Sequence, residues 1–92
     1  MRNLTLGDFR QALNEFYDDR VRVNANQFVG DDLLDAKLKK DLGLDSLGSV
    51  VLSMVLKKVT NSKIDEKKIN LASYDGSVRG YLEVISKALK EN

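Results

Sequence analysis

The chain contains no cysteine, so it forms no disulfide and offers no thiolate as a nucleophile or metal ligand. It also contains no histidine, which removes the commonest general base and the commonest metal-binding side chain. Proline and tryptophan are absent, and no hydrophobic run approaches the length needed to span a membrane. A histidine-based triad, a cysteine nucleophile and a soft-metal site are thereby excluded, and we expect that the protein is not an enzyme.

The 92 residues are enough for one domain, 1–92, and too few for two hydrophobic cores. Hydrophobic residues make up 42% of the chain and charged residues 32%, as in an ordinary soluble globular protein. The net charge is +1, and lysine pairs are scattered without interleaved aromatic residues, which argues against binding to nucleic acid or to anionic membranes. No apolar signal segment opens the sequence, so we expect a cytoplasmic monomer that does not insert into a membrane.

Four segments have the pattern of helices. The first, over residues 5–18, opens with a capping-box spacing at Thr5–Asp8 and continues with apolar residues at helical intervals. A second helix is predicted over residues 46–60, a short third one after Asp65, and a fourth from the turn at 75–77 to the C-terminus. Helices this short must pack their apolar faces together, so we predict an all-α fold, a small four-helix bundle with a short third helix.

A long connection separates the first two predicted helices. Residues 21–25 alternate apolar and polar side chains, as a short strand would, but no partner strand is evident and an extended loop is the preferred interpretation. Asp32 is predicted to cap a short helix over residues 33–40. Asp31 and Asp35 lie nearby but lack the spacing of a calcium loop, so no metal site is predicted there.

Ser46 is the candidate functional residue, because its hydroxyl stands where this connection meets the second helix. Asp45 and Ser46 are both residue types that open helices. A phosphate ester on Ser46 would lie beside the free N–H groups of the first helical turn, where anions are favoured. The alternative is that Ser46 is only an N-cap, as most serines in such positions are.

The second predicted helix carries two apolar stripes at helical spacing. The first is expected to face the core and consists of Leu52, Leu56 and Val59. The second is rotated away from it and consists of Leu47, Val50 and Met54. One stripe is enough to hold a helix on a small core, so we expect the second to face partner proteins. The alternative is a helix buried on two sides, by the bundle and by the long loop.

The stretch Asp41–Leu47 has the sequence D-L-G-L-D-S-L and resembles the phosphopantetheine attachment site of acyl carrier proteins, with the pattern D-L-G-x-D-S-L. The likeness follows the whole chain in order and spacing, and it is specific over residues 41–56. It implies a fold of acyl-carrier-protein type in which Ser46 carries 4′-phosphopantetheine, delivered from coenzyme A by a separate magnesium-dependent transferase. Acyl groups would be held as thioesters on the arm's terminal thiol, for fatty acid, polyketide or related lipid biosynthesis.

The resemblance also implies the partners, which are the phosphopantetheinyl transferase and acyl-transferring or condensing enzymes. The chain departs from the family in charge, because residues 46–64 contain no acid while Lys57, Lys58 and Lys63 lie in or just beyond the helix. Charge complementarity sets partner choice, so we expect a specialised carrier with dedicated enzymes. The predicted partner-binding face consists of Asp45, Leu47, Val50, Met54, Lys57 and Lys58. The alternative function is an unmodified, carrier-like helical module that binds a partner through its second helix.

Overall fold

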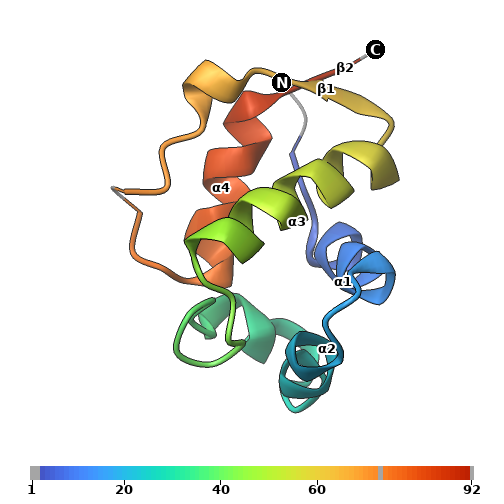
Figure 1. Cartoon of the computed structure of the whole chain (residues 1–92), viewed down its shortest axis with the longest axis vertical. Coiled ribbons are helices and arrows are strands. Elements are labelled where there is room, and N and C mark those ends of the chain that lie inside the picture. Colours follow the sequence, from blue (N-terminus) through green and yellow to red (C-terminus); the bar gives the residue numbers. More distant parts are fainter. Residues whose placement is uncertain (1–2, 73, 92) are drawn as a thin grey trace.

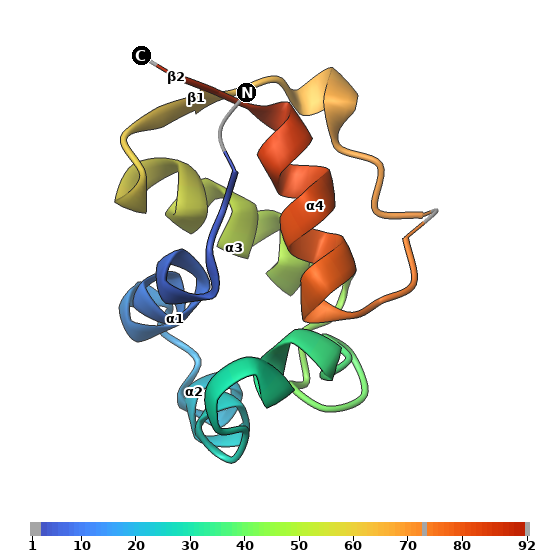
Figure 2. The same ribbon diagram turned by 180° about the vertical axis from the view of Figure 1, so that it is seen from behind.

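The computed structural model describes residues 3–72 and 74–91, and it shows a small, mostly helical fold (Figure 1). In chain order the elements are α1 (Leu6–Glu15), α2 (Asp19–Asn26), the 3-10 helix η1 (Gly30–Asp35), α3 (Ser46–Val59), strand β1 (Ser62–Ile64), the 3-10 helix η2 (Glu66–Lys68), α4 (Val78–Ala88) and strand β2 (Leu89–Glu91). Helix α3 crosses in front of α4 in Figure 1 and behind it in the reverse view of Figure 2. Helix α1 packs along α3, and η1 packs against α4.

Helix α1 begins where the capping pattern predicts it. The Thr5 hydroxyl accepts a hydrogen bond from the Asp8 N–H at 3.1 Å, and the Asp8 carboxylate accepts one from the Thr5 N–H at 3.0 Å. The capping box is therefore complete. Phe9 and Leu13 are buried on the inner face, as their spacing predicts. The helix ends at Glu15, three residues earlier than expected.

Helix α2 corrects the prediction of an extended loop or short strand in this part of the chain. Asp18 caps the helix, since its carboxylate accepts a hydrogen bond from the Arg20 N–H at 3.0 Å. Val21 and Ala25 are buried, whereas Val23 between them is exposed. Two apolar residues four positions apart satisfy the helical period as well as the period of a strand, and packing of this pair into the core selects the helix.

The 3-10 helix η1 corrects the prediction for the segment that follows α2. Its N-cap residue is Val29, which makes no capping hydrogen bond through its side chain, so Asp32 does not cap a helix over residues 33–40. The element ends at Asp35 because Ala36 has an extended backbone. Together, α2 and η1 occupy much of the long loop that was predicted between the first two helices.

The segment between η1 and α3 is fixed by backbone hydrogen bonds to the turn before α4. The Leu38 N–H donates to the Gly76 carbonyl at 2.9 Å, and the Val78 N–H donates to the Ala36 carbonyl at 2.9 Å. The side chains that anchor this segment in the core are Leu38, Leu42 and Leu44. The entry to α3 is therefore held by a part of the chain that is distant in sequence.

Helix α3 occupies the segment predicted for it, and α4 begins directly after the turn at 75–77, as predicted. In α3, Leu52 and Leu56 are fully buried and Val59 packs at the edge of the core, so the inner stripe is confirmed. Helix α4 follows Ser77, whose hydroxyl accepts a hydrogen bond from the Gly80 N–H at 3.0 Å. The large buried side chains of α4 are Val78, Tyr81, Leu82 and Ile85.

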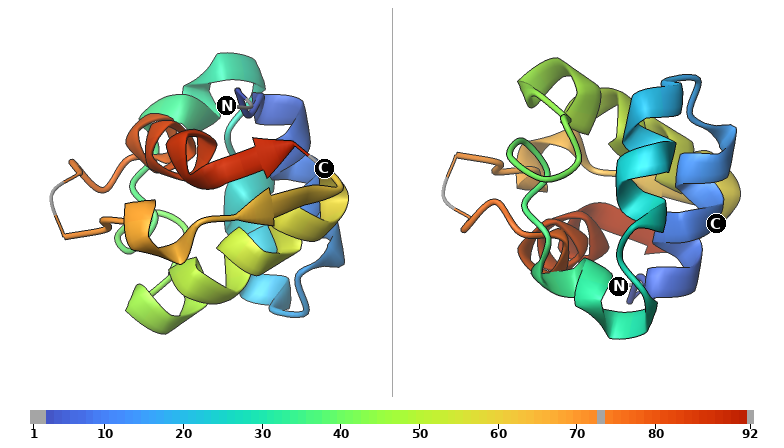
Figure 3. Two further views of the ribbon diagram at one scale, coloured as in Figure 1. Left: turned by 90° about the horizontal axis from the view of Figure 1, so that it is seen from above. Right: turned by 90° about the horizontal axis from the view of Figure 1, so that it is seen from below.

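The end of the chain corrects the prediction of a helix that continues to the C-terminus. Helix α4 stops at Ala88, and β2 pairs antiparallel with β1, with Lys63 opposite Lys90. Figure 3 shows the two strands side by side at one end of the molecule, where β1 follows α3 and β2 follows α4. Between them along the chain, η2 confirms the short third helix, and the Asp65 carboxylate accepts a hydrogen bond from the Lys67 N–H at 3.2 Å.

The described residues thus form a mostly helical fold with a small two-stranded sheet. The prediction of a small, mostly helical fold is confirmed, whereas an all-α four-helix bundle with one long loop is not what the structure contains. In the portion of the chain that the structure covers, no helix is both long and apolar enough to cross a membrane.

Candidate functional site

Ser46 is the first residue of α3, and it is exposed to solvent. It lies beside an open groove with a volume of about 290 Å³, formed by the segment before α3 and the turn before α4. Three lysines line the same groove, namely Lys37, Lys39 and Lys40. An enzyme can therefore reach the Ser46 hydroxyl from solvent, and positive charge lies close to it.

Asp45, and not Ser46, caps α3. The Asp45 carboxylate accepts a hydrogen bond from the Gly48 N–H at 2.7 Å, and the Asp45 backbone is extended, with φ −80° and ψ −174°. Within the described residues, the Ser46 hydroxyl makes no hydrogen bond, and the N–H groups of Ser46 and Leu47 have no protein acceptor. The alternative that Ser46 serves as the N-cap is therefore wrong, because the preceding side chain already does so.

Gly48 makes room for this cap. A Cβ at position 48 would lie 3.2 Å from Asp45 Oδ1 and 3.1 Å from Leu44 Cδ2, closer than most side-chain contacts. A larger residue would press on the capping carboxylate and on a buried leucine. The glycine therefore costs some helix propensity in the first turn but allows a short Asp45 hydrogen bond.

The residues just before Ser46 divide into core anchors and turn formers. Leu42 and Leu44 are buried. Between them, Gly43 has φ 76°, a left-handed conformation that favours glycine. The Asp41 carboxylate accepts a hydrogen bond from the Lys37 N–H at 2.7 Å, which closes the turn on the other side. The local sequence therefore specifies the turn from which Ser46 projects.

Tyr81 ties the first turn of α3 to α4. Its hydroxyl donates a hydrogen bond to the Ser49 carbonyl at 2.6 Å. Its ring meets Phe9 edge-on, with 6.3 Å between the ring centroids. Burial, with a smaller contribution from Tyr74, raises the pKa of Tyr81 above its ordinary value, so the phenol remains a protonated donor. This contact fixes the turn that carries Ser46 relative to the core.

Asp75 forms part of the opposite wall of the groove. Hydrogen bonds from the Ser77 hydroxyl at 2.6 Å and the Ser77 N–H at 2.9 Å lower the pKa of Asp75 below its ordinary value. Lys37 Nζ donates to the Asp75 carbonyl at 3.1 Å, which links the two walls. The groove therefore has charges of both signs, with an ionised carboxylate opposite the lysines.

The outward side of α3 carries four large apolar side chains, which we call the outer stripe. Leu47 is 72% exposed, Val50 48%, Val51 46% and Met54 42%. Their spacing of i, i+3, i+4 and i+7 places them on one helix face, opposite the buried residues of α3. The alternative of a helix buried on two sides is therefore wrong. Sequence reasoning missed Val51, although its distance of four residues from Leu47 would have placed it in the stripe.

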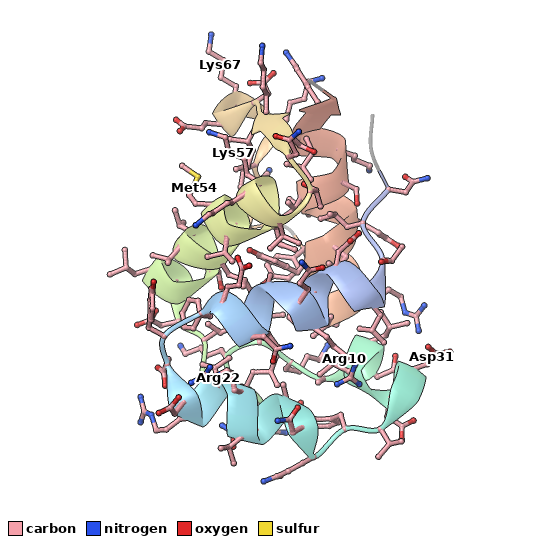
Figure 4. All side chains as sticks on the ribbon, turned by 90° about the vertical axis from the view of Figure 1, so that its right-hand side faces the viewer. Arg10, Arg22, Asp31, Met54, Lys57 and Lys67 are labelled. Atoms are coloured by element: carbon pink, nitrogen blue, oxygen red, sulfur yellow. The ribbon has the colours of Figure 1, made fainter. Side chains whose placement is uncertain are left out.

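Lysines continue this face beyond the outer stripe. Lys57 and Lys58 lie one turn after Met54, and with Lys63 they line an open hollow of about 480 Å³. Figure 4 shows Met54 and Lys57 on the same outer side of α3. We call Lys57, Lys58 and Lys63 the lysine rim. In the described part of the chain, no carboxylate forms a salt bridge with any of these three lysines. The predicted face is thus an apolar and basic surface, with Asp45 at its far end.

No protein-family model matches the chain, and comparisons with curated proteins and with solved structures likewise find no significant similarity. Within residues 3–72 and 74–91, no cluster of three or more acidic side chains could hold a metal ion. The function must therefore be inferred from the site itself. The site provides one exposed hydroxyl, first-turn N–H groups and a helix face suited to contacts, an arrangement that allows covalent modification and partner binding.

Proposed function

We propose that the chain is an acyl carrier protein and that 4′-phosphopantetheine is attached to Ser46. The observation that carries the proposal is that the Ser46 hydroxyl is exposed and does not cap α3, because the Asp45 side chain does so. The hydroxyl also lies within the stretch Asp41–Leu47, which resembles the attachment site of that family. A serine needed only for folding would be expected to accept a hydrogen bond from the first turn, and Ser46 does not.

The groups around Ser46 fit a phosphodiester. The N–H groups of Ser46 and Leu47 lie at the positive end of the α3 dipole, where anions are stabilised. Exposed lysines at positions 39 and 40 line the adjoining groove and add positive charge. When bound, the phosphopantetheine arm would supply the thiol that this cysteine-free chain lacks, on which acyl groups are held as thioesters.

The chain's own residues hold and present the attachment point. Leu42 and Leu44 anchor the preceding turn in the core, and the Tyr81 hydrogen bond holds the first turn of α3. Among the described residues, no side chain forms a hydrogen bond with the Ser46 hydroxyl. In the transfer, the Ser46 oxygen would form a bond to the pantetheine-bearing phosphorus of coenzyme A, while the bond from that phosphorus to adenosine 3′,5′-bisphosphate would break and this nucleotide would leave. The separate magnesium-dependent transferase would provide the base that takes the Ser46 proton.

As a carrier, the protein would serve acyl-transferring or condensing enzymes of fatty acid, polyketide or related lipid biosynthesis in the cytoplasm. The lysine rim and the absence of acids over residues 46–64 favour a specialised pathway with dedicated enzymes. The order of elements, with a long helix directly after the attachment serine and a short one after Asp65, supports a fold of acyl-carrier-protein type.

Intact-mass measurement tests the attachment. After incubation with coenzyme A and a broad-specificity transferase, we expect a single phosphopantetheine adduct on the native chain and none on Ser46→Ala. The matched control is Ser49→Ala, which removes a buried serine three residues along the same helix and should still be modified. A folded native chain that gains no adduct with several transferases would contradict the proposal.

The second candidate is an unmodified module that binds a partner through α3. It is favoured by the outer stripe, whose exposure does not depend on any modification of Ser46. The same mass experiment separates the two candidates. The module would gain no adduct, and Ser46→Ala would leave its partner binding unchanged.

A further inference from the structure

We propose that the outer stripe and the lysine rim form one docking surface for an enzyme whose contact patch is apolar and bordered by carboxylates. That the partner is an enzyme acting on the phosphopantetheine arm rests on the proposed function. The chemistry of the contact follows from α3 itself, whose outward face is apolar along its first two turns and basic at its end.

The apolar part of this surface is a cluster and not scattered exposure. The four residues of the outer stripe share one helix face and contribute nothing to the core beneath α3. Among the described residues, the other strongly exposed large apolar side chains lie singly on other segments, and they are Tyr17, Val23 and Val29. Single exposed apolar side chains are ordinary, whereas a contiguous group marks a contact site.

Among the residues that the structure describes, no carboxylate forms a salt bridge with the lysine rim at the end of the stripe. Residues 46–64 contain no acid. The Asp45 carboxylate is engaged in capping α3, and Asp65 accepts a hydrogen bond from the next segment while lying 3.8 Å from Lys90 Nζ. A partner that buries this face must therefore bring its own carboxylates, or the lysine rim would be desolvated without compensation. The hollow beside Met54 offers space for acidic side chains.

Two other occupants fit less well. Single-stranded nucleic acid would be expected to stack on aromatic residues, but the outer stripe contains only leucine, valine and methionine, and the net charge of the chain is +1. A second copy of the chain would bring three more lysines and, along this face, only the Asp45 carboxylate that already caps its own helix. Neither occupant satisfies both the apolar stripe and the lysine rim.

The size of the surface indicates a brief contact. Stable complexes use roughly 20–30 residues on each side, far more than the outer stripe and lysine rim together. A small apolar surface with a charged border gives fast, salt-sensitive association and easy release. These are the properties that a carrier needs if it is to visit several enzymes in turn.

The test is an NMR titration of the unmodified chain with two synthetic helical peptides. Both peptides present leucines on one face, and the flanking residues are glutamates in one peptide and lysines in the other. We expect the glutamate peptide to shift the amide signals of α3 and Lys63, with binding that weakens as salt is added. The lysine peptide should bind about tenfold more weakly or not at all.

Charge reversal on the protein provides the matched control. Lys57→Glu with Lys58→Glu should remove the preference for the glutamate peptide, with a loss of about tenfold in affinity. Arg20→Glu with Lys87→Glu makes the same change in net charge at exposed positions on α2 and α4, and affinity should change by less than about twofold. Met54→Asp should weaken binding to either peptide, because it interrupts the apolar stripe.

Equal affinity for the two peptides would overturn the proposal, as would peptide-induced shifts confined to other elements. It would also be overturned by tighter binding to an anionic vesicle or a DNA oligonucleotide than to the glutamate peptide, or by self-association that Met54→Asp abolishes. The titration uses the unmodified chain, so its failure leaves attachment at Ser46 untouched. Conversely, the absence of a mass adduct leaves the docking result untouched.

Discussion

Replacement of two neighbouring residues, Asp45 and Ser46, provides a direct test of how the site is built. In the structure the capping hydrogen bond belongs to Asp45, and the Ser46 hydroxyl makes no hydrogen bond within the described chain. Asp45→Ala should therefore destabilise the fold, whereas Ser46→Ala should not. The two variants change adjacent side chains in the same turn, so each is a control for the other.

The expected loss of unfolding free energy in Asp45→Ala follows from the capping interaction that the substitution removes. Loss of an aspartate N-cap costs about 1 kcal/mol, and loss of its charge at the positive end of the dipole adds about 0.3–1 kcal/mol. For a domain of this size, each 1 kcal/mol lowers Tm by roughly 4–8 °C, so Asp45→Ala should lower Tm by about 5–15 °C. Ser46→Ala should change the free energy of unfolding by less than about 0.5 kcal/mol, since alanine is a good helix former at an exposed position.

Thermal unfolding followed by far-ultraviolet circular dichroism at neutral pH measures both effects. Asp45→Asn serves as an intermediate, because it keeps the accepting oxygen and removes only the charge, and it should retain most of the stability. If Ser46→Ala destabilised the protein as much as Asp45→Ala, Ser46 would be the cap after all. The Ser46 hydroxyl would then be engaged in capping α3 and would not be available for modification.

Three further predictions concern the core contact, the groove and the outer stripe. Tyr81→Phe removes the hydrogen bond to the Ser49 carbonyl and should cost about 1 kcal/mol of unfolding free energy in urea. Because burial raises the pKa of Tyr81 above 10.0, its contribution is present below pH 10 and is lost as the pH rises further, so Tyr81→Phe should be less sensitive to alkali than the native chain. Hydrogen bonds from Ser77 lower the pKa of Asp75 below 3.8. The contribution of Asp75 to the free energy of unfolding is therefore present above pH 3.8 and is lost as the pH falls through the lower native pKa. Asp75→Asn should flatten the acid side of a profile of stability against pH, measured by urea unfolding. Met54→Asp should leave the circular dichroism spectrum and Tm nearly unchanged while it slows transfer of phosphopantetheine or acyl groups by partner enzymes, and unfolding of this variant would instead place Met54 in the core.

Much of the helical framework could be predicted from the sequence, because its signals are local. The capping box at Thr5–Asp8 and the run of apolar residues after Ser46 each specify a helix through neighbouring residues alone. Helix α2 was missed because Val21 and Ala25 satisfy two periods at once, and only packing against the core distinguishes them. The pairing of β1 with β2 was missed because each strand has three residues, too few for alternation to be recognised.

In the candidate site too, features specified by neighbouring residues could be predicted, and features that depend on the folded backbone could not. The outer stripe could be predicted from helical spacing, apart from Val51, which was left out although it lies on the same face. The choice between Asp45 and Ser46 as the cap could not be predicted, because both side chains are good N-caps and only the backbone geometry decides between them. The lysines around Ser46 come from a turn whose position depends on distant hydrogen bonds, such as that from Leu38 to Gly76.

The pairing of β2 with β1 has a practical consequence for any experiment on the intact chain. With Lys90 opposite Lys63, β2 brings the end of the described chain close to the basic end of α3, so an affinity tag or fluorescent fusion joined to β2 would begin near the lysine rim. An acidic tag placed there would compete with an acidic enzyme for the same lysines. Binding assays are therefore better designed with the label at an internal exposed site on α2, away from both strands.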